Sequence, residues 1–394
     1  MSQLTTHKRS FLWFMLIFWL TNPLSIVAQN KYNILCVDDE DSIKVSVSCT
    51  FDDELSQANY LLLSSQCEIK HTNIAGFLRK EDTLYFKQGV KELNIEYVMP
   101  KYYYTDSAIC LRRENNWYPH RNGELLTATV DVITEGTSNY VISGERITNN
   151  SYYTDTAYEI HLIILPKDRF TPITKESSVR PHIFYRSNLD TTLHDDAYYN
   201  EFITSYEFYS SFFGDSLSRE PMNIIEIRDP QFMLCQSLQG VILFGGYFYE
   251  IYSMIPYFSW IPHEVSHQWW GNRVFFEHLD YALGESLNEY IKLQFLKKRG
   301  TGYEEQMEYY KMMIEQATEQ LPIAEIHSLE DMNKSIAIYH AAPYNLEQME
   351  SKEVYAILRQ LYRKHKNTLV KRKTFDQECG VLIDWLTPSK NKQP

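Results

Sequence analysis

The chain has 394 residues, of which 44% are hydrophobic and 23% are charged, and this composition is typical of a folded globular protein rather than a disordered one. At roughly 100 to 200 residues per domain, the length predicts two or three domains. The formal net charge of -13 argues against a nucleic-acid partner, because affinity for phosphate depends mainly on Lys and Arg side chains.

Residues 1–29 have the pattern of a secretory signal peptide. Lys8 and Arg9 precede an apolar run over residues 11–20, and small or polar residues follow as far as Ala28. The run is short for a membrane span and Pro23 follows it closely. We therefore expect export to the periplasm, the cell surface or the medium, with no stable membrane insertion beyond this segment. An uncleaved membrane anchor is the alternative.

Residues 30–175 predict an N-terminal antiparallel β-sandwich. Several short runs alternate or are rich in β-branched and aromatic residues, and turn residues separate them. The predicted strands cover residues 42–51, 58–69, 83–87, 93–99, 125–133 and 158–165.

Cysteines are concentrated in the same region. Four of the six lie in the first third of the chain, and none forms a C-x-x-C pair, which argues against a cysteine zinc site. Because an exported chain permits disulfides, we expect one or two bridges among Cys36, Cys49, Cys67 and Cys110, with a pairing that the sequence does not give.

Residues 176–394 predict a second domain that is mainly helical. Aromatic residues recur at helical spacing over residues 195–214, strands are expected at 222–227 and 240–244, and the chain beyond Tyr252 has a mostly helical pattern. The boundary between the two domains is expected at residues 170–180.

The segment from Ile261 to Asn272 contains the pattern H-E-x-x-H. On a helix, positions i and i+4 share one face, so His263 and His267 are able to bind one metal ion. Glu264 follows the first histidine and is expected to face a water molecule at the metal rather than the metal itself. Neutral imidazoles suit zinc, and a catalytic zinc site needs a third protein ligand and one open position.

A second predicted helix supplies the candidate third ligand, Glu285. Seventeen residues separate His267 from Glu285, which allows one turn and an antiparallel return of the chain. Glu277 and Asp280 lie too close to the end of the first helix for an easy return. Glu289, one turn after Glu285, either orients a ligand from behind or lies on a solvated face.

The stretch 263–272 resembles the H-E-x-x-H-x-W-x-G-N signature of aminopeptidase-N-type gluzincin metallopeptidases. Leu283-Gly284-Glu285 with Tyr290 is similar to the helix that carries the third ligand of that family, and Trp117-Tyr118-Pro119 to a motif of its β domain. The resemblance implies a thermolysin-like, mainly helical catalytic domain that holds one Zn²⁺ ion and hydrolyses peptide or protein substrates. It implies Glu264 as the general base and Tyr339 as the oxyanion donor, with Tyr344 as the rival.

The chain departs from the family pattern at three places. The glutamate that binds the substrate amine in the G-x-M-E-N loop is replaced by Ser237 or Gln239, depending on the gap, so aminopeptidase activity is expected to be lost or weak. Ala282 and Ser286 replace the usual tryptophan and glycine near the third ligand. The large C-terminal helical domain of many members is expected to be absent. The alternative function is a zinc-bearing scaffold that binds protein or glycan without cleaving it.

Overall fold

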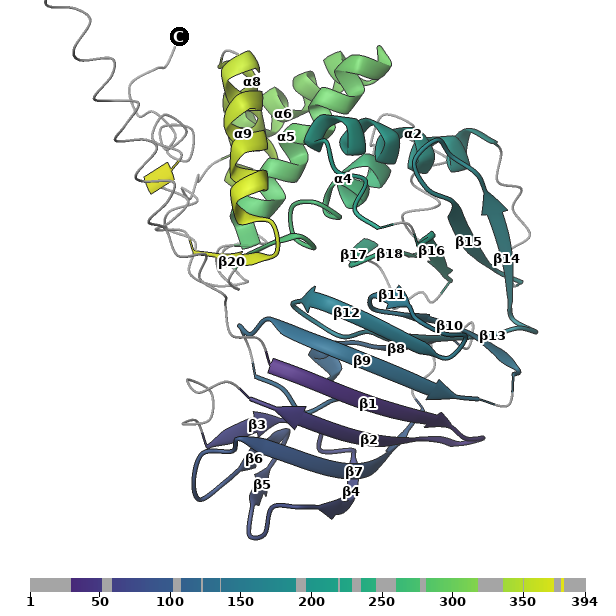
Figure 1. Cartoon of the computed structure of the whole chain (residues 1–394). Helices are drawn as coiled ribbons and strands as arrows, with labels where there is room; N and C mark the ends of the chain where they lie inside the picture. Colours follow the sequence, from purple (N-terminus) through teal and green to yellow (C-terminus); the bar gives the residue numbers. More distant parts are fainter. Residues whose placement is uncertain are drawn as a thin grey trace, which may run out of the picture.

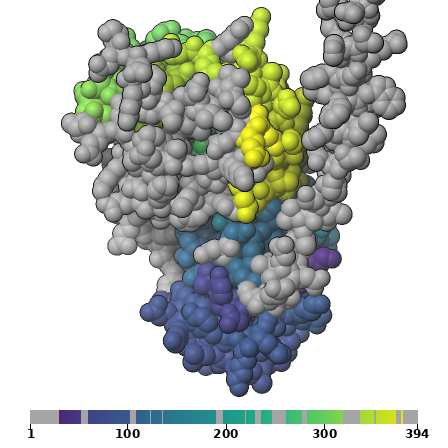
Figure 2. All heavy atoms as spheres, turned by 90° about the vertical axis from the view of Figure 1, so that its left-hand side faces the viewer, coloured from purple at the N-terminus to yellow at the C-terminus, as the bar shows by residue number. Residues whose placement is uncertain are grey.

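The computed structural model describes most of the chain beyond residue 29, over the ranges 30–51, 59–101, 108–121, 123–134, 136–188, 196–218, 220–228, 235–245, 260–276, 281–317, 336–349, 351–371 and 377–378. The predicted signal segment and Cys379 lie outside these ranges. None of the helices in these ranges is both long and apolar enough to cross a membrane. A β-rich N-terminal half precedes a half that carries the helices, as the sequence predicts, and the two halves form opposite ends of the molecule (Figures 1 and 2).

The largest sheet of the N-terminal half has seven strands in the order β11-β12-β9-β1-β2-β7-β4. In β1, Tyr32, Ile34 and Cys36 point into the core and alternate with exposed residues, as a sheet with one solvated face requires. The prediction of a purely antiparallel sandwich is wrong at one pair, because β9 lies parallel to β1. The strands of this half are β1 (Asn30–Asp38), β2 (Ser42–Thr50), β3 (Tyr60–Leu62), β4 (Glu68–Thr72), β5 (Leu78–Lys80), β6 (Thr83–Tyr85), β7 (Glu92–Pro100), β8 (Ile109–Leu111), β9 (Leu126–Ile133), β10 (Ser138–Ile142), β11 (Glu145–Arg146), β12 (Ser151–Ala157) and β13 (Leu162–Pro166), with the 3-10 helix η2 (Arg113–Asn115).

A three-stranded sheet, β10-β13-β8, lies between the two halves. Leu162 and Ile164 of β13 pack into the core of the seven-stranded sheet, whereas Ile163 and Leu165 pack into a second core shared with the C-terminal half. Both faces of β13 are therefore buried, which explains its unbroken apolar sequence. This core joins the two halves.

The C-terminal half contains a five-stranded sheet in the order β14-β15-β16-β18-β17. Helices cover the face of this sheet that is opposite the three-stranded sheet (Figure 1). Strand β14 pairs with β15, so residues 170–175 belong to this sheet and not to the sheets of the N-terminal half. The elements are β14 (Phe170–Lys175), β15 (His182–Ser187), α2 (Asp196–Phe213), β16 (Met222–Ile227), β17 (Cys235–Leu238), β18 (Val241–Gly245), α4 (Trp260–Ser266), β19 (Val274–Phe276), α5 (Tyr281–Arg299), α6 (Tyr303–Gln316), the π-helix η4 (Ala337–Ala341), α8 (Ala342–Glu347), α9 (Ser351–His365) and β20 (Thr368–Val370).

The expected disulfides of the first third are absent. None of Cys36, Cys49, Cys67 and Cys110, which are all buried, forms a disulfide with another described cysteine. Cys36 lies opposite Val45 in the β1–β2 pair and Cys49 lies opposite Tyr32, so the register of these strands does not bring the two thiols together. These cysteines are small apolar side chains of the core.

Candidate metal centre

The H-E-x-x-H segment lies on α4 and on the turn that continues it. Pro262 lies in the first turn of the helix, where a missing N–H is tolerated. His263, Glu264 and His267 are all buried, and the backbone N–H of His267 bonds to the carbonyl of His263, so the two imidazoles face the same side. Gly271 follows with φ +127, and a Cβ atom there would approach Nδ1 of His267 to 3.2 Å, so glycine suits this position.

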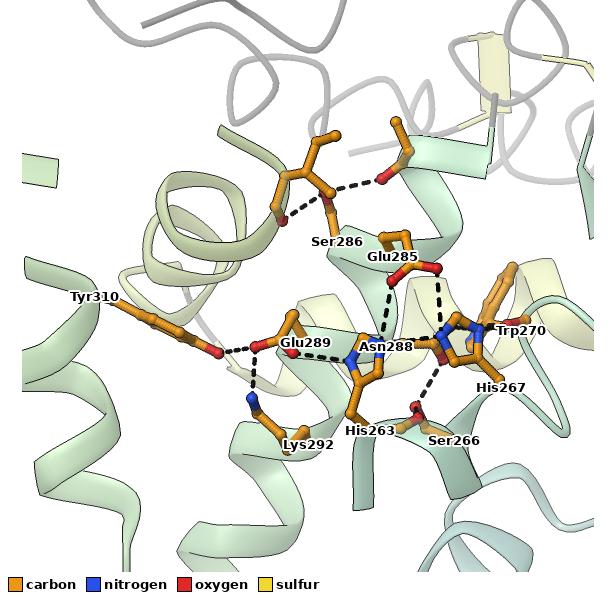
Figure 3. Close-up of polar contacts among 12 residues, drawn as sticks. His263, Ser266, His267, Trp270, Glu285, Ser286, Asn288, Glu289, Lys292 and Tyr310 are labelled. Carbon is orange, nitrogen blue, oxygen red and sulfur yellow. Dashed lines mark hydrogen bonds and ion pairs between the residues drawn. The ribbon is translucent and has the colours of Figure 1, made fainter. Parts of the chain in front are cut away.

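Glu285, on α5, meets the two histidines (Figure 3). Nε2 of His263 lies 3.0 Å from Nε2 of His267 and 3.1 Å from Oε2 of Glu285, and Nε2 of His267 lies 3.3 Å from Oε1 of Glu285. Ligands bound at about 2.0–2.2 Å in a tetrahedron lie roughly 3.3–3.5 Å from one another. The observed separations of 3.0–3.3 Å are close to that spacing, and these three residues are the one group of this kind among the described residues.

The ring nitrogen of His263 that does not face Glu285 and His267, which we call its outer nitrogen, contacts a second carboxylate. Nδ1 of His263 lies 2.8 Å from Oε1 of Glu289, whose side chain is 4% exposed. Lys292 contacts Oε2 of Glu289 at 2.6 Å, and the hydroxyl of Tyr310 donates to the same oxygen (Figure 3). Of the two roles left open by the sequence, the solvated face is wrong for Glu289. The spacing of three between Glu289 and Lys292 is a sequence signal for their pair, whereas nothing in the sequence points to Tyr310.

The outer nitrogen of His267 is also held in place. Nδ1 of His267 lies 3.2 Å from the carbonyl oxygen of Trp270 and 2.7 Å from the Asn288 amide. That amide donates to the same carbonyl at 2.8 Å and accepts a hydrogen bond from Ser266 at 2.8 Å. With both outer nitrogens occupied in this way, each imidazole presents Nε2 to the centre. Asn288 was not predicted as a site residue from the sequence, although this residue shares one face of α5 with Glu285.

Burial and charge act against each other in this centre. Burial lowers the pKa of His263, but the carboxylates of Glu289 and Glu285 outweigh it and raise the pKa to about 10. Burial raises the pKa of Glu285, but the imidazoles of His267 and His263 hold it well below its ordinary value. Burial also raises the pKa of Glu264, and here it exceeds the opposing effect of the two imidazoles. Glu264 thus lies within electrostatic range of both histidines without bonding to either.

Tyr339 lies beside the centre on the π-helix η4, a type of helix that often occurs at functional sites. Its ring centroid lies 6.4 Å from that of His263. Burial, the charges of Glu285 and Glu289, and a hydrogen bond to Glu285 raise the pKa of Tyr339 well above its usual value, so its hydroxyl remains a donor at neutral pH. The rival Tyr344 lies on α8 and makes no hydrogen bond, ion pair or ring contact with any residue that the structure describes.

Ser286 connects the metal-ligand helix to this π-helix. Its side chain is fully buried, and its hydroxyl lies 3.1 Å from the carbonyl oxygen of Ala282 and 2.9 Å from that of Ile338 (Figure 3). The second bond joins the residue after Glu285 to the residue before Tyr339. The sequence showed only that a serine replaces the glycine of the family.

Ser237, on β17, and Gln239, in the turn after it, are the two alternatives for the position that the family pattern gives to an amine-binding glutamate. The hydroxyl of Ser237 accepts hydrogen bonds from Gln268 at 2.7 Å and from Asn272 at 3.1 Å, so it is occupied by the segment that carries the histidines. Gln239 lies in the turn after β17 and lines a cavity between the two halves of the molecule. Neither side chain supplies a negative charge.

Comparisons with known proteins bear on the fold that carries this centre. No protein-family model and no curated protein sequence matches the chain. Among solved structures, an M1 zinc metallopeptidase from Deinococcus radiodurans superposes with a TM-score of 0.69 at 14% identity, covering 93% of this chain and 96% of the other. A mutant of that enzyme bound to a Tyr-Ser-Ala substrate, and a two-domain M1 zinc metallopeptidase mutant bound to L-tryptophan, each have a TM-score of 0.69 at 13% identity and cover 93% of this chain and 95% of theirs. The structural neighbours of this chain are M1, aminopeptidase-N-type, zinc metallopeptidases, and the chain has their fold.

Proposed function

We propose that this protein is a zinc-dependent peptidase with a thermolysin-like catalytic domain. The observation that carries the proposal is the convergence of His263, His267 and Glu285 in a fold shared with M1 zinc metallopeptidases, with the non-ligand carboxylate of Glu264 beside them. His263, His267 and Glu285 would hold one zinc ion, through both Nε2 atoms and the carboxylate.

Each remaining residue has a role that its position supports. A bound zinc ion would polarise the scissile carbonyl and lower the pKa of a water molecule toward 7. Glu264 would accept the proton of that water and deliver it to the leaving amine. Tyr339 is a neutral donor beside His263, and it would donate a hydrogen bond to the oxyanion. Glu289 and Asn288 would keep the two imidazoles oriented.

The substrate is proposed to be a peptide or protein bound without recognition of a free amino terminus. A buried ammonium needs a charged partner, and a neutral hydroxyl is a weaker one. Ser237 is neutral and its hydroxyl already accepts two hydrogen bonds. Cleavage within a peptide, or of N-blocked peptides, is therefore favoured over removal of single amino-terminal residues. Export through the N-terminal segment remains part of the proposal and would place the substrate outside the cytoplasm.

The alternative function is a zinc-bearing scaffold that binds protein or glycan. The lack of an acidic residue at the Ser237 position on β17 is consistent with this scaffold function. A structural zinc would not need Glu264, however, because this carboxylate is not one of the three converging donors. Its burial in the centre therefore favours the peptidase.

A peptide library tests both parts of the proposal. Matched peptides with free and N-acetylated termini are incubated with zinc-loaded protein and with its Glu264→Gln variant, and cleavage sites are mapped by mass spectrometry. We expect internal cleavage that does not require a free amine, and a kcat lower by about 10²- to 10⁴-fold in Glu264→Gln with zinc retained. Equal inertness of both proteins, each holding one zinc, would favour the scaffold. Turnover that requires a free amine would refute the substrate proposal.

A further inference from the structure

A cavity of about 100 Å³ lies between the two halves of the molecule. Strands β10 to β12 and the turns between them form one wall, and the segments that begin β15 and β16, the β17–β18 turn and the end of the histidine segment form the other. The space is large enough for several water molecules or one small anion. Nothing in the proposed peptidase chemistry uses it.

Three arginines line this cavity: Arg146, Arg180 and Arg273. No carboxylate of the described chain lies within 4.0 Å of any of these guanidinium groups. Two acids, Glu145 and Glu220, also line the cavity, and Glu145 accepts a hydrogen bond from Ser218 instead of pairing with an arginine. Three arginines at one cavity thus lack a carboxylate partner among the described residues, although the net charge of the chain is -13.

Arg180 is the strongest evidence for a ligand. The residue is 4% exposed, and its guanidinium donates from Nη1 to the Tyr206 hydroxyl at 2.9 Å. Its Nε has no hydrogen-bond partner in the parts of the chain that are described. A buried cation is costly unless a counter-charge and further hydrogen bonds compensate it. The planar fork of a guanidinium matches the paired oxygens of phosphate, sulfate or carboxylate.

We propose that this cavity binds a small oxyanion, held by Arg180 with Arg146 and Arg273. Arg146 comes from the N-terminal half and the other two arginines from the C-terminal half, so the bound anion would join the two. Gln268, which follows the ligand His267, is also in the wall, and its side chain accepts a hydrogen bond from the backbone of Gly240 at 2.8 Å. The anion therefore stabilises the joint behind the metal centre. This site is separate from the proposed peptidase function.

Inorganic phosphate is the first probe. Zinc-loaded protein is titrated with phosphate at constant ionic strength, balanced with sodium chloride, and the midpoint of thermal unfolding is followed, with sulfate and acetate as parallel titrations. A ligand that binds only the folded state raises the midpoint in a saturable way. We expect a saturable rise of a few degrees with phosphate. The relative response to sulfate and acetate identifies the anion geometry that the cavity prefers.

Variants of the cavity arginines test whether the phosphate that raises the midpoint binds in the cavity. In Arg146→Gln and in Arg180→Lys we expect the phosphate concentration for the half-maximal rise in the midpoint to increase at least about tenfold, because the first variant loses a positive charge and the second loses the planar guanidinium fork. Arg169→Gln is the matched control, because Arg169 is an exposed arginine outside the cavity. Phosphate that binds at the zinc instead of in the cavity would raise the midpoint equally in Arg146→Gln and in the parent protein. No saturable rise in the parent protein, or an unchanged response in Arg146→Gln, would overturn the proposal.

Discussion

At the scale of single residues, the convergence of His263, His267 and Glu285 could be predicted from the sequence, and most of their supporting contacts could not. The spacing of His263 and His267 fixes a common face, and a carboxylate on the next helix can reach it. The role of Glu289 stayed open because helix periodicity gives the face of a residue but not what packs against it. Tyr310 comes from a different helix, 21 residues further along the chain, and its contact with Glu289 depends on tertiary packing.

The contact between Glu289 and His263 gives a prediction about metal affinity. Replacing Glu289 with glutamine removes the charge behind the imidazole while keeping the shape, and outer partners of this kind typically contribute a factor of about 10 to 100. We expect the zinc dissociation constant of Glu289→Gln, measured by competition with a chromogenic chelator, to rise by about that factor.

Glu347→Gln is the matched control for this measurement. The Glu347 side chain is 4% exposed and bonds to Lys297, Tyr303 and Gln294 rather than to a metal ligand. The same zinc affinity in both variants would show that Glu289 does not support the metal centre.

At the scale of helices and strands, the pattern of apolar and aromatic residues located several elements. The strand predicted at 222–227 and the helix predicted at 195–214 correspond to β16 and α2. The strand predicted at 158–165 is in fact β13, which begins four residues later, because a strand buried on both faces has no alternation to mark its start. The run predicted at 58–69 is divided between β3 and β4. The parallel pairing of β1 with β9 brings together strands that are far apart in the sequence, so no pattern within either strand predicts it.

The bond between α5 and the π-helix gives a prediction at this scale. Ser286 and Ile338 are 52 positions apart, so their hydrogen bond fixes where the π-helix places Tyr339 relative to Glu285. Ser286→Ala should lower kcat by about 10- to 100-fold, because small displacements of a catalytic group are costly, while KM and zinc content stay near their parent values.

Ser205→Ala provides the comparison for Ser286→Ala. Ser205 is equally buried and its hydroxyl bonds to the carbonyl of Phe202 at 3.0 Å, on α2. Thermal unfolding should show similar destabilisation in both variants, whereas the loss of kcat should occur only in Ser286→Ala. An equal loss of kcat in both would reduce Ser286 to a structural residue.

At the scale of the whole molecule, the three cores stack the seven-stranded sheet, the three-stranded sheet, the five-stranded sheet and the helices in that order. The chain length predicted two or three domains, but it could not reveal that β8, β10 and β13 are shared between two cores. Several histidines are buried in these layers. Burial, reinforced by nearby arginines, lowers the pKa of His120 and His161 to about 3 and that of His182 to about 4.

These histidines predict a loss of stability in acid. Each stays neutral in the folded protein, whereas in the unfolded chain it binds a proton below its ordinary pKa of about 6.5. Stability is therefore full above pH 6.5 and falls as the pH drops toward 4, by up to about 2 kcal/mol per histidine at pH 5. Urea unfolding of zinc-loaded protein at pH 7.5 and pH 5 measures the difference.

His161→Gln isolates one of the three contributions. His161 is fully buried beside the Ser143 hydroxyl, at 2.9 Å, with Arg112 as the nearby charge. The variant should be less stable at pH 7.5 but should lose less stability between pH 7.5 and pH 5 than the parent. An identical pH dependence in the two proteins would contradict the assignment.

The most direct measurement is the zinc content of purified, zinc-loaded and dialysed protein, determined by plasma mass spectrometry for the parent and for Glu285→Ala, with circular dichroism to verify folding. If His263, His267 and Glu285 share one ion, the parent holds about one zinc per chain and the folded variant holds almost none. A parent protein without zinc, or a variant that keeps the full amount, would contradict the metal centre.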